Sequence, residues 1–311
     1  MLLVRGRWDL SCCTKDKEYR LMNPCLFLNK RGSLEVVGRM TRSLPPPIVR
    51  VENTRWAEFE GYERVDVSLP MDSFIVRKDV QQKTPWVVAQ PELRVCTQMD
   101  NNGFEDPRTF WYCGELYVIA NFRGGEDCAQ NLVVYNLEGL PRVMFLHKRN
   151  ITEKNWTFFE VGDQLMCVYS ISPFRVGIMK HNSVELKYES TCPIVGAVGG
   201  GATPVYLQQY GVYLGVAHVR REYIKDDHVY HTYRNFFYTF QSAPPYTFLK
   251  HHLFHVDKHA HIEFASGLIV IADRLLISIG TDDIRATVIE YSLHQLLHIL
   301  NHNNINARGG E

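Results

Sequence analysis

Short apolar runs separated by turns dominate this chain. The runs are rich in Val, Ile, Tyr and Phe, residue types that favour β-strands, and Gly- or Asp-containing turns punctuate them. Many short strands spread over a whole chain predict an all-β protein, which could be a sandwich, a barrel or a propeller. Strands are expected over residues 25–29, 34–38, 115–121, 132–136, 164–170, 175–179, 205–208, 212–217, 235–240, 268–271, 275–279 and 286–291.

One helix is expected near the C-terminus. Ser292 is a suitable N-cap residue, and it precedes a run in which Leu293, Leu296, Leu297 and Leu300 fall on one helical face. The spacing therefore predicts a short amphipathic helix that packs its leucines on the β-structure.

Three further expectations concern the organisation of the chain. Residues 43–84 open with three consecutive prolines and have a weaker pattern, so we expect a surface arm or lid there, which could also mediate a homo-oligomer. Residues 301–311 are expected to be a disordered tail. No composition shift marks a domain boundary, and residues 1–311 are interpreted as a single domain.

Composition narrows the class of protein. The chain has 34 Lys+Arg and 34 Asp+Glu, so its formal net charge is zero and no broad attraction to nucleic acid or an anionic membrane is expected. No apolar run is long enough to span a bilayer. The 8 cysteines show no metal-ligand spacing. We therefore expect free thiols, no metal, no cofactor, and a cytoplasmic or other soluble intracellular location.

The most informative segment is residues 101–108, Asn-Asn-Gly-Phe-Glu-Asp-Pro-Arg. It places Glu105, Asp106 and Arg108 within four residues, between a turn and an expected strand. Pro107 disfavours the helical region for Asp106, so an extended or bend conformation is expected there. A rigid carboxyl at a strand mouth suits proton transfer to a leaving oxygen. The alternative is a turn with a surface ion pair.

Other clusters carry groups that bind anions or sugars. Lys154 next to Trp156 could hold an anion at a strand start. The glycines at 199–201 allow close approach of the backbone to a ligand. His218 and Arg220 share one face of a strand end, where a guanidinium suits phosphate. Each cluster also has an ordinary interpretation: a solvated Lys with a buried Trp, a flexible connection, or a basic strand end.

A final pair of carboxylates, Asp282 and Asp283, follows the expected strand 275–279. Carboxylates accept hydroxyl hydrogen bonds from sugars, although a polar turn is the simpler interpretation. Other enzyme classes lack their sequence signals: there is no nucleophile elbow for a Ser/His/Asp triad and no glycine fingerprint for a nucleotide-binding fold.

Taken in order, these elements resemble the five-bladed β-propeller family of β-mannoside phosphorylases and the related β-1,2-mannosyltransferases. Residues 105–108 resemble the Glu-Asp-Pro-Arg of that family. The resemblance implies a five-bladed β-propeller with a short C-terminal helix. Further similar elements are Asn23-Pro24, Arg39, Lys154, residues 199–201, Pro204, Tyr210-Gly211, His218, Pro244-Pro245, residues 264–268 and residues 280–283.

The resemblance also implies site roles. Asp106 would be the general acid of an inverting transfer of a β-linked mannosyl unit. Gln130 stands where the bacterial phosphorylases carry an Arg, and Arg123 could substitute for it. The residues expected to bind sugar are Asn23, Arg39, Glu105, Arg108, Asp283 and Trp156, and those expected to bind phosphate are Lys154, His218, Arg123, Arg220 and Gln130.

The implied substrates are a mannose oligosaccharide with inorganic phosphate or mannose 1-phosphate, and the reverse reaction would synthesise β-mannan. An alternative is a β-1,2-mannosyltransferase that uses GDP-mannose. A non-catalytic glycan-binding propeller is an alternative of another class. A hydrolase would need a second carboxylate as base, for which Glu263 is the candidate.

Overall fold

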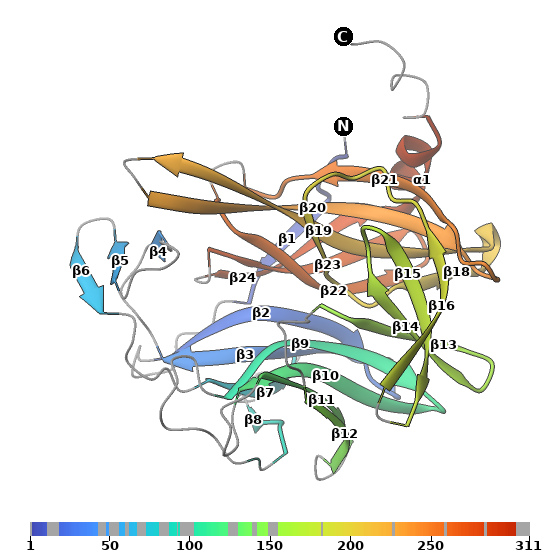
Figure 1. Ribbon diagram of the computed structural model, residues 1–311, viewed down its shortest axis with the longest axis horizontal. Helices are drawn as coiled ribbons and strands as arrows, with labels where there is room; N and C mark the ends of the chain where they lie inside the picture. The colour runs from blue at the N-terminus through green and yellow to red at the C-terminus, as the bar shows by residue number, and fades with distance from the viewer. Residues whose placement is uncertain are drawn as a thin grey trace.

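The computed structural model shows five blades of antiparallel strands (Figure 1). The predicted all-β propeller and the five blades implied by the resemblance are therefore confirmed. The structure describes residues 2–10, 19–42, 48–49, 56–59, 62–66, 73–80, 87–91, 93, 103–123, 130–138, 142–148, 155–181, 183–225, 228–257, 260–282 and 285–302.

The first three blades follow one another along the chain. Blade 1 contains β2 (Tyr19–Leu28), β3 (Leu34–Arg42), β7 (Ser73–Asp79) and β8 (Val87–Val88). Blade 2 contains β9 (Gly103–Tyr112), β10 (Glu115–Arg123), β11 (Gln130–Asn136) and β12 (Arg142–Lys148). Blade 3 contains β13 (Thr157–Val161), β14 (Gln164–Ser170), β15 (Phe174–Lys180) and β16 (Ser183–Ser190).

The last two blades complete the ring. Blade 4 contains β17 (Ala197–Gly200) and β18 (Val205–Leu207), which both pair with β19 (Val212–Lys225), then β20 (His228–Gln241) and β21 (Phe248–Phe254); the 3-10 helix η1 spans Gln208–Tyr210. Blade 5 contains β22 (Glu263–Ile271), β23 (Arg274–Thr281), β24 (Arg285–Ser292) and β1 (Gly6–Asp9). Helix α1 (Leu293–His302) follows β24, and β4 (Ile48–Val49), β5 (Trp56–Phe59) and β6 (Tyr62–Asp66) form a separate small sheet.

Apolar side chains fill the space between neighbouring blades, because each sheet buries both faces against the next. The first strands lie against one another at the centre, β2 beside β9 and β22, and β9 beside β13. Each interface has its own cluster, represented by Phe27 with Phe104, Phe110 with Phe158, Phe159 with Tyr213, Phe237 with Tyr291, and Leu26 with Val288. The inner strands are thereby fixed relative to one another.

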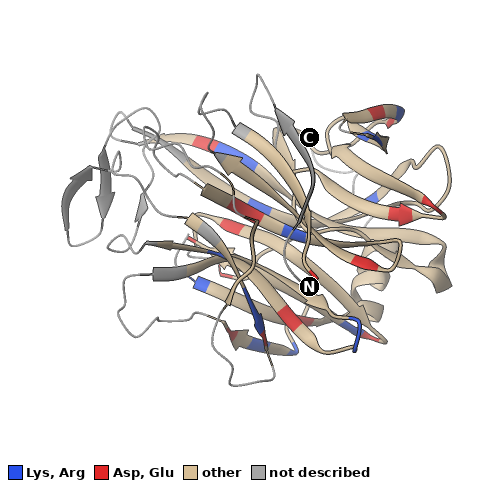
Figure 2. Ribbon diagram, turned by 90° about the horizontal axis from the view of Figure 1, so that it is seen from below, with Lys and Arg blue, Asp and Glu red and all other residues tan. Residues whose placement is uncertain are grey.

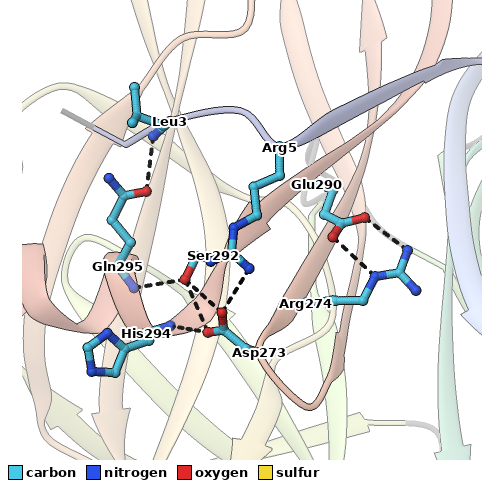
Figure 3. A network of polar contacts seen from close by, with 8 residues as sticks. All are labelled: Leu3, Arg5, Asp273, Arg274, Glu290, Ser292, His294 and Gln295. Atoms are coloured by element: carbon cyan, nitrogen blue, oxygen red, sulfur yellow. Dashed lines mark hydrogen bonds and ion pairs between the residues drawn. The ribbon is translucent and has the colours of Figure 1, made fainter.

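The structure confirms the predicted C-terminal helix. The leucines at 293, 296, 297 and 300 are all buried, and the N–H of Gln295 donates to the Ser292 hydroxyl at 3.2 Å. The helix runs two residues further than expected, into the range 301–311; the rest of that range lies outside the described residues. The Gln295 amide oxygen accepts from the N–H of Leu3 at 3.2 Å, so the helix also holds the N-terminal segment (Figure 3).

Two expectations about strands need correction. β7 lies inside the range 43–84 that we expect to form an arm, yet it is the third strand of blade 1, and its Ile75 is fully buried. Its apolar run is short and its second half is charged, which hides the strand pattern. β19 does not end at Ala217 but continues to Lys225, because its polar outer half pairs along its whole length with β20.

Charges of both signs are interspersed over the described strands (Figure 2), as the zero formal net charge leads one to expect. In the described ranges, no helix has the length and apolar character needed to cross a membrane.

Asp273, in the turn between β22 and β23, accepts hydrogen bonds from the N-terminal segment, the end of β24 and the start of α1 (Figure 3). Its carboxylate accepts from the His294 N–H at 2.8 Å, from the Ser292 hydroxyl at 3.0 Å and from the Arg5 guanidinium at 2.8 Å. The bond from the His294 N–H, followed by those from Ser292 and Arg5, lowers the pKa of Asp273. One carboxylate therefore links the start of the chain, the last blade and the helix.

We predict that Asp273→Ala lowers the unfolding temperature at neutral pH. A carboxyl whose pKa is depressed in the folded state adds stability above its ordinary pKa of about 3.9, and this stability is lost as the pH falls through the folded-state pKa. The difference from the wild type should therefore shrink below about pH 4 in thermal denaturation followed by circular dichroism. Asp163→Ala, in an exposed turn, is the control. A difference that persists unchanged at acid pH would contradict this account.

Candidate active site

The predicted acid lies inside a strand, and its backbone differs from our expectation. Asp106 and Pro107 occupy a bulge of β9 opposite Ala120 of β10. Asp106 has φ 50°, in the left-handed region, whereas an extended or bend conformation was expected. The residue before proline avoids the right-handed helical region, and a short polar side chain tolerates the left-handed one. The bulge follows because Pro107 has no N–H for the ladder.

Blade 1 contains the same kind of bulge before a proline. Asn23 and Pro24 occupy a bulge of β2 opposite Gly38, and Asn23 has φ 45°. The Asn23 Nδ2 donates to Asp106 Oδ1 at 2.6 Å, across the boundary between the two blades. Asn23 therefore orients the carboxyl that is predicted to act as an acid.

Gly280 of blade 5 leaves room for the Asn23 side chain that contacts Asp106. A Cβ at Gly280 of β23 would lie 2.3 Å from Asn23 Oδ1 and 2.9 Å from its backbone nitrogen. Any larger residue at this position would displace Asn23, and the orientation of Asp106 would change with it. Gly280 belongs to one of the sequence elements that resemble the family, and its close packing against Asn23 explains why a glycine is needed there.

Arg108 is the centre of the site. Its side chain is fully buried, with 1% exposed. The guanidinium donates to Asn155 Oδ1 at 2.7 Å and to the Gly201 carbonyl at 2.5 Å, and it lies 5.2 Å from the centre of the Phe264 ring. Burial lowers the pKa of Arg108, and the negative charge of Asp106 opposes this. The side chain thereby contacts blades 3, 4 and 5 from blade 2.

The glycines at 199–201 form a strand and its end, where we expected either a flexible connection or an anion cradle. A Cβ at Gly200 would lie 2.2 Å from the Asn155 carbonyl oxygen, and one at Gly199 would lie 2.7 Å from His218 Nε2. A Cβ at Gly201 would lie 2.6 Å from a backbone oxygen of β22. The three glycines therefore allow three blades to approach each other closely around Arg108.

His218 faces the same centre. It is 4% exposed, pairs with Gly199, and its ring lies 5.2 Å from Phe264 and 5.2 Å from Tyr233. Phe264 thus lies next to both the imidazole of His218 and the guanidinium of Arg108. The structure brings together the predicted residues Asn23, Asp106, Arg108 and His218.

Arg39 and Glu105 form a second, adjoining group. Their side chains make an ion pair at 3.3 Å with 7% and 12% exposed. Ser73 fixes the pair: its hydroxyl accepts from Arg39 Nε at 2.8 Å and donates to the Phe104 carbonyl at 2.6 Å. Glu105 is therefore held beside Asp106 with its charge balanced.

Three other candidate residues make contacts that the sequence did not indicate. Trp156, one of the residues expected to bind sugar, is 2% exposed and packs within the apolar cluster of blades 2 and 3. Arg220 is paired with Glu222 at 3.1 Å. Glu263 is fully buried, and it accepts from the N–H groups of the loop between β21 and β22 at 2.9 and 2.6 Å. Burial raises the pKa of Glu263, and its contacts support that loop.

The structure describes only some of the remaining candidate residues. Arg123 and Gln130 face each other at the end of the β10–β11 hairpin, and Arg123 pairs with Gly103, close to Asp106 along β9. Their backbones therefore lie at the same end of the propeller as the acid. Lys154 and Asp283 lie outside the described residues.

Sequence reasoning missed three supporting residues. Asn155, with φ 73°, binds Arg108 from the start of blade 3, Ser73 holds Arg39, and Phe264 lies next to both Arg108 and His218. The one available signal was positional: Asn23, Asp106 and Asn155 are each a short polar residue at the beginning of a blade.

We predict that Arg108→Lys destabilises the protein by about 3 kcal/mol, because one ammonium cannot replace a planar fork and leaves buried acceptors unpaired. Denaturant unfolding measures this difference. Arg221→Lys, at an exposed position on β19, should change the free energy of unfolding by less than about 0.5 kcal/mol. Equal, small effects of the two substitutions would show that Arg108 does not hold the blades together.

No protein-family model and no curated protein sequence matches this chain. Solved structures do match it over nearly the whole length. The mannose phosphorylase MPT-4 from Leishmania mexicana, in complex with phosphate, has a TM-score of 0.62 at 13% identity, covering 96% of this chain and 91% of that one. The β-1,2-mannobiose phosphorylase from Listeria innocua, in complex with β-1,2-mannobiose, has a TM-score of 0.60 at 14% identity, covering 95% and 98%.

A third structure, the GDP-Man-dependent mannosyltransferase MPT-1 from Leishmania mexicana, has a TM-score of 0.60 at 12% identity, covering 93% of this chain and 91% of that one. Phosphate-using and nucleotide-sugar-using enzymes are thus about equally similar to it. The chain has the five-bladed propeller fold of mannoside phosphorylases and mannosyltransferases.

Proposed function

We propose that this protein is an inverting β-1,2-mannoside phosphorylase that also runs towards synthesis from mannose 1-phosphate. The observation that carries the proposal is the carboxyl of Asp106, oriented at 2.6 Å by Asn23 at the centre of the ring. The fold shared with mannoside phosphorylases supports the choice of reaction. Fold alone does not determine chemistry, so the proposal depends on this site.

In the proposed phosphorolysis, Asp106 gives its proton to the glycosidic oxygen, directly or through a sugar hydroxyl. The bond between that oxygen and the anomeric carbon breaks, and a phosphate oxygen attacks the same carbon from the opposite face. The products are mannose 1-phosphate with inverted configuration and a shortened mannoside. A hydrolase would need a second carboxylate to activate water, whereas phosphate is already an anionic nucleophile.

The neighbouring residues have proposed positioning roles. Asn23, Arg39 and Glu105 bind hydroxyls of the mannosyl unit, and Asp283 assists them. Arg108 holds the blades that surround this unit, and its positive charge favours anionic groups nearby. Lys154, His218, Arg123 and Gln130 are the proposed phosphate ligands. Trp156 is left out because its ring packs in the apolar cluster between blades 2 and 3.

A β-1,2-mannosyltransferase that uses GDP-mannose is the second candidate. Its support is the similarity to the mannosyltransferase MPT-1, which is close to that of the phosphorylases. The same cations would then meet a diphosphate, and Asp106 would act as the base that accepts the proton of the acceptor hydroxyl.

We predict that Asp106→Asn lowers kcat by about 10²–10⁴-fold, the usual contribution of a general acid. The unfolding temperature should stay near that of the wild type, because the amide oxygen of Asn still accepts from Asn23. Phosphate release from mannose 1-phosphate and a mannose acceptor measures the rate, and Asp163→Asn in an exposed turn is the matched control. Unchanged turnover in the Asp106 variant would overturn the assignment of the acid.

A separate measurement distinguishes the two donors. We expect β-1,2-mannobiose to be converted to mannose 1-phosphate in the presence of inorganic phosphate, and GDP-mannose to give no elongated product. Turnover with GDP-mannose alone would replace the phosphorylase by the transferase. If both donors are inert while mannosides still bind, a non-catalytic glycan-binding propeller is the better description.

A further inference from the structure

The hairpin of β19 and β20 extends beyond the rest of blade 4. The inner strand β17 pairs with β19 as far as Arg220, opposite Ala197. β19 and β20 continue to pair up to Lys225 and His228, so the hairpin projects about 17 Å further at ~3.3 Å per residue. In blade 5 the equivalent hairpin ends at Thr281, which pairs with the first residue of β22.

The projecting part is continuous with the strand that carries His218. β19 carries His218 and runs outward from it, so the hairpin continues directly from the candidate site. Figure 1 shows its tip on the left, the side on which β3 ends.

One face of the hairpin carries a row of polar side chains, here called the outer strip: Arg220, Glu222, His231 and Tyr233. Residues directly opposite each other in antiparallel strands share a face, and Arg220 pairs with Tyr233 while Glu222 pairs with His231. His218 is two residues before Arg220 and therefore on the same face. The outer strip is thus a continuation of the site.

The strip is held in place at both its strands. The Tyr233 N–H donates to the His261 carbonyl at 2.8 Å, and Arg234 donates to the Ala260 carbonyl at 2.9 Å. The Tyr223 hydroxyl lies 3.5 Å from His261 Nδ1. These contacts fix the hairpin to the residues that lead into β22, the strand that carries Phe264. A wall held in this way presents its side chains without a large ordering cost on binding.

The charges of the strip are balanced, which points to a neutral ligand. Arg220 is 3.1 Å from Glu222, with 35% and 51% of their side chains exposed, and His231 Nδ1 is 3.7 Å from the same carboxylate. A guanidinium paired with a carboxylate attracts an anion weakly, whereas guanidinium and carboxylate groups are both able to hydrogen bond to sugar hydroxyls. The half-buried ring of Tyr233, 5.2 Å from His218, adds an apolar surface next to them.

We propose that the outer strip binds the mannose units of an oligosaccharide that lie beyond the reacting unit. Arg220 is thereby assigned to sugar hydroxyls, whereas the sequence analysis assigned it to phosphate. This inference rests on the proposed function, since it takes the ligand to be a mannose oligosaccharide. It makes the hairpin the element that selects chain length.

Calorimetric titration of the protein with mannose and with β-1,2-linked mannobiose, mannotriose and mannotetraose tests the proposal without requiring turnover. In the wild type, affinity should rise with chain length. We expect Arg220→Ala and Tyr233→Ala to weaken binding of the triose and tetraose about tenfold, or about 1.4 kcal/mol, and to leave mannose and inorganic phosphate unaffected. Tyr233→Phe should retain most of the affinity, because it keeps the ring.

Arg221→Ala is the matched control: it removes the same group one residue along β19, on the opposite face and exposed. Equal affinities of the Arg220 and Arg221 variants for the tetraose would overturn the proposal, as would weaker phosphate binding in Arg220→Ala with unchanged tetraose binding. Failure of the proposed function is read separately, from the absence of turnover with inorganic phosphate. If the wild type binds none of the mannosides, both the proposed function and this inference are wrong.

Discussion

The buried guanidinium of Arg108 is the interaction on which the centre of this propeller depends. A charge taken out of water is tolerated only when acceptors surround it. Here these acceptors are the Asn155 side chain and the Gly201 carbonyl, from blades 3 and 4, with the Phe264 ring of blade 5 against the guanidinium plane. Backbone carbonyls reach this position because the glycines at 199–201 have no side chains to keep the blades apart. The geometry of the site therefore follows from closing a ring of sheets around one charge.

The acid has its position for a related reason. Left-handed backbone at a non-glycine residue costs of order 1–3 kcal/mol, and both Asn23 and Asp106 adopt it before a proline. The two bulges face each other at the boundary of blades 1 and 2, so that their side chains hydrogen bond at 2.6 Å. Extended strands would send these side chains elsewhere. The strain in the inner strands thus serves to bring an amide and a carboxyl together at the centre of the ring.

The sequence predicted those parts of the structure that have a local signal. Apolar strands and the leucine face of α1 were recognised because burial imposes a period on the residues themselves. β16 was missed because it is a polar strand with exposed side chains, and β17 because glycine is depleted in strands. At the site, the acidic motif was found, but Asn155 was not, since one Asn before a Trp carries no pattern. In blades 1 to 3 the shared feature is a single short polar residue with positive φ, Asn23, Asp106 or Asn155, which is too short for a periodicity search.

The choice of donor cannot depend on the centre of the ring alone. Structures named for phosphate-using and GDP-Man-dependent enzymes match this chain with TM-scores of 0.62 and 0.60, so the fold accommodates both. The oriented carboxyl of Asp106 suits either reaction, as acid or as base. Under the proposed function, what must differ is the group that meets a phosphate or a diphosphate. Under the proposed function, the ion pair of Arg220 with Glu222 weakens the attraction of that guanidinium for an anion, and His218 is the remaining phosphate candidate on β19.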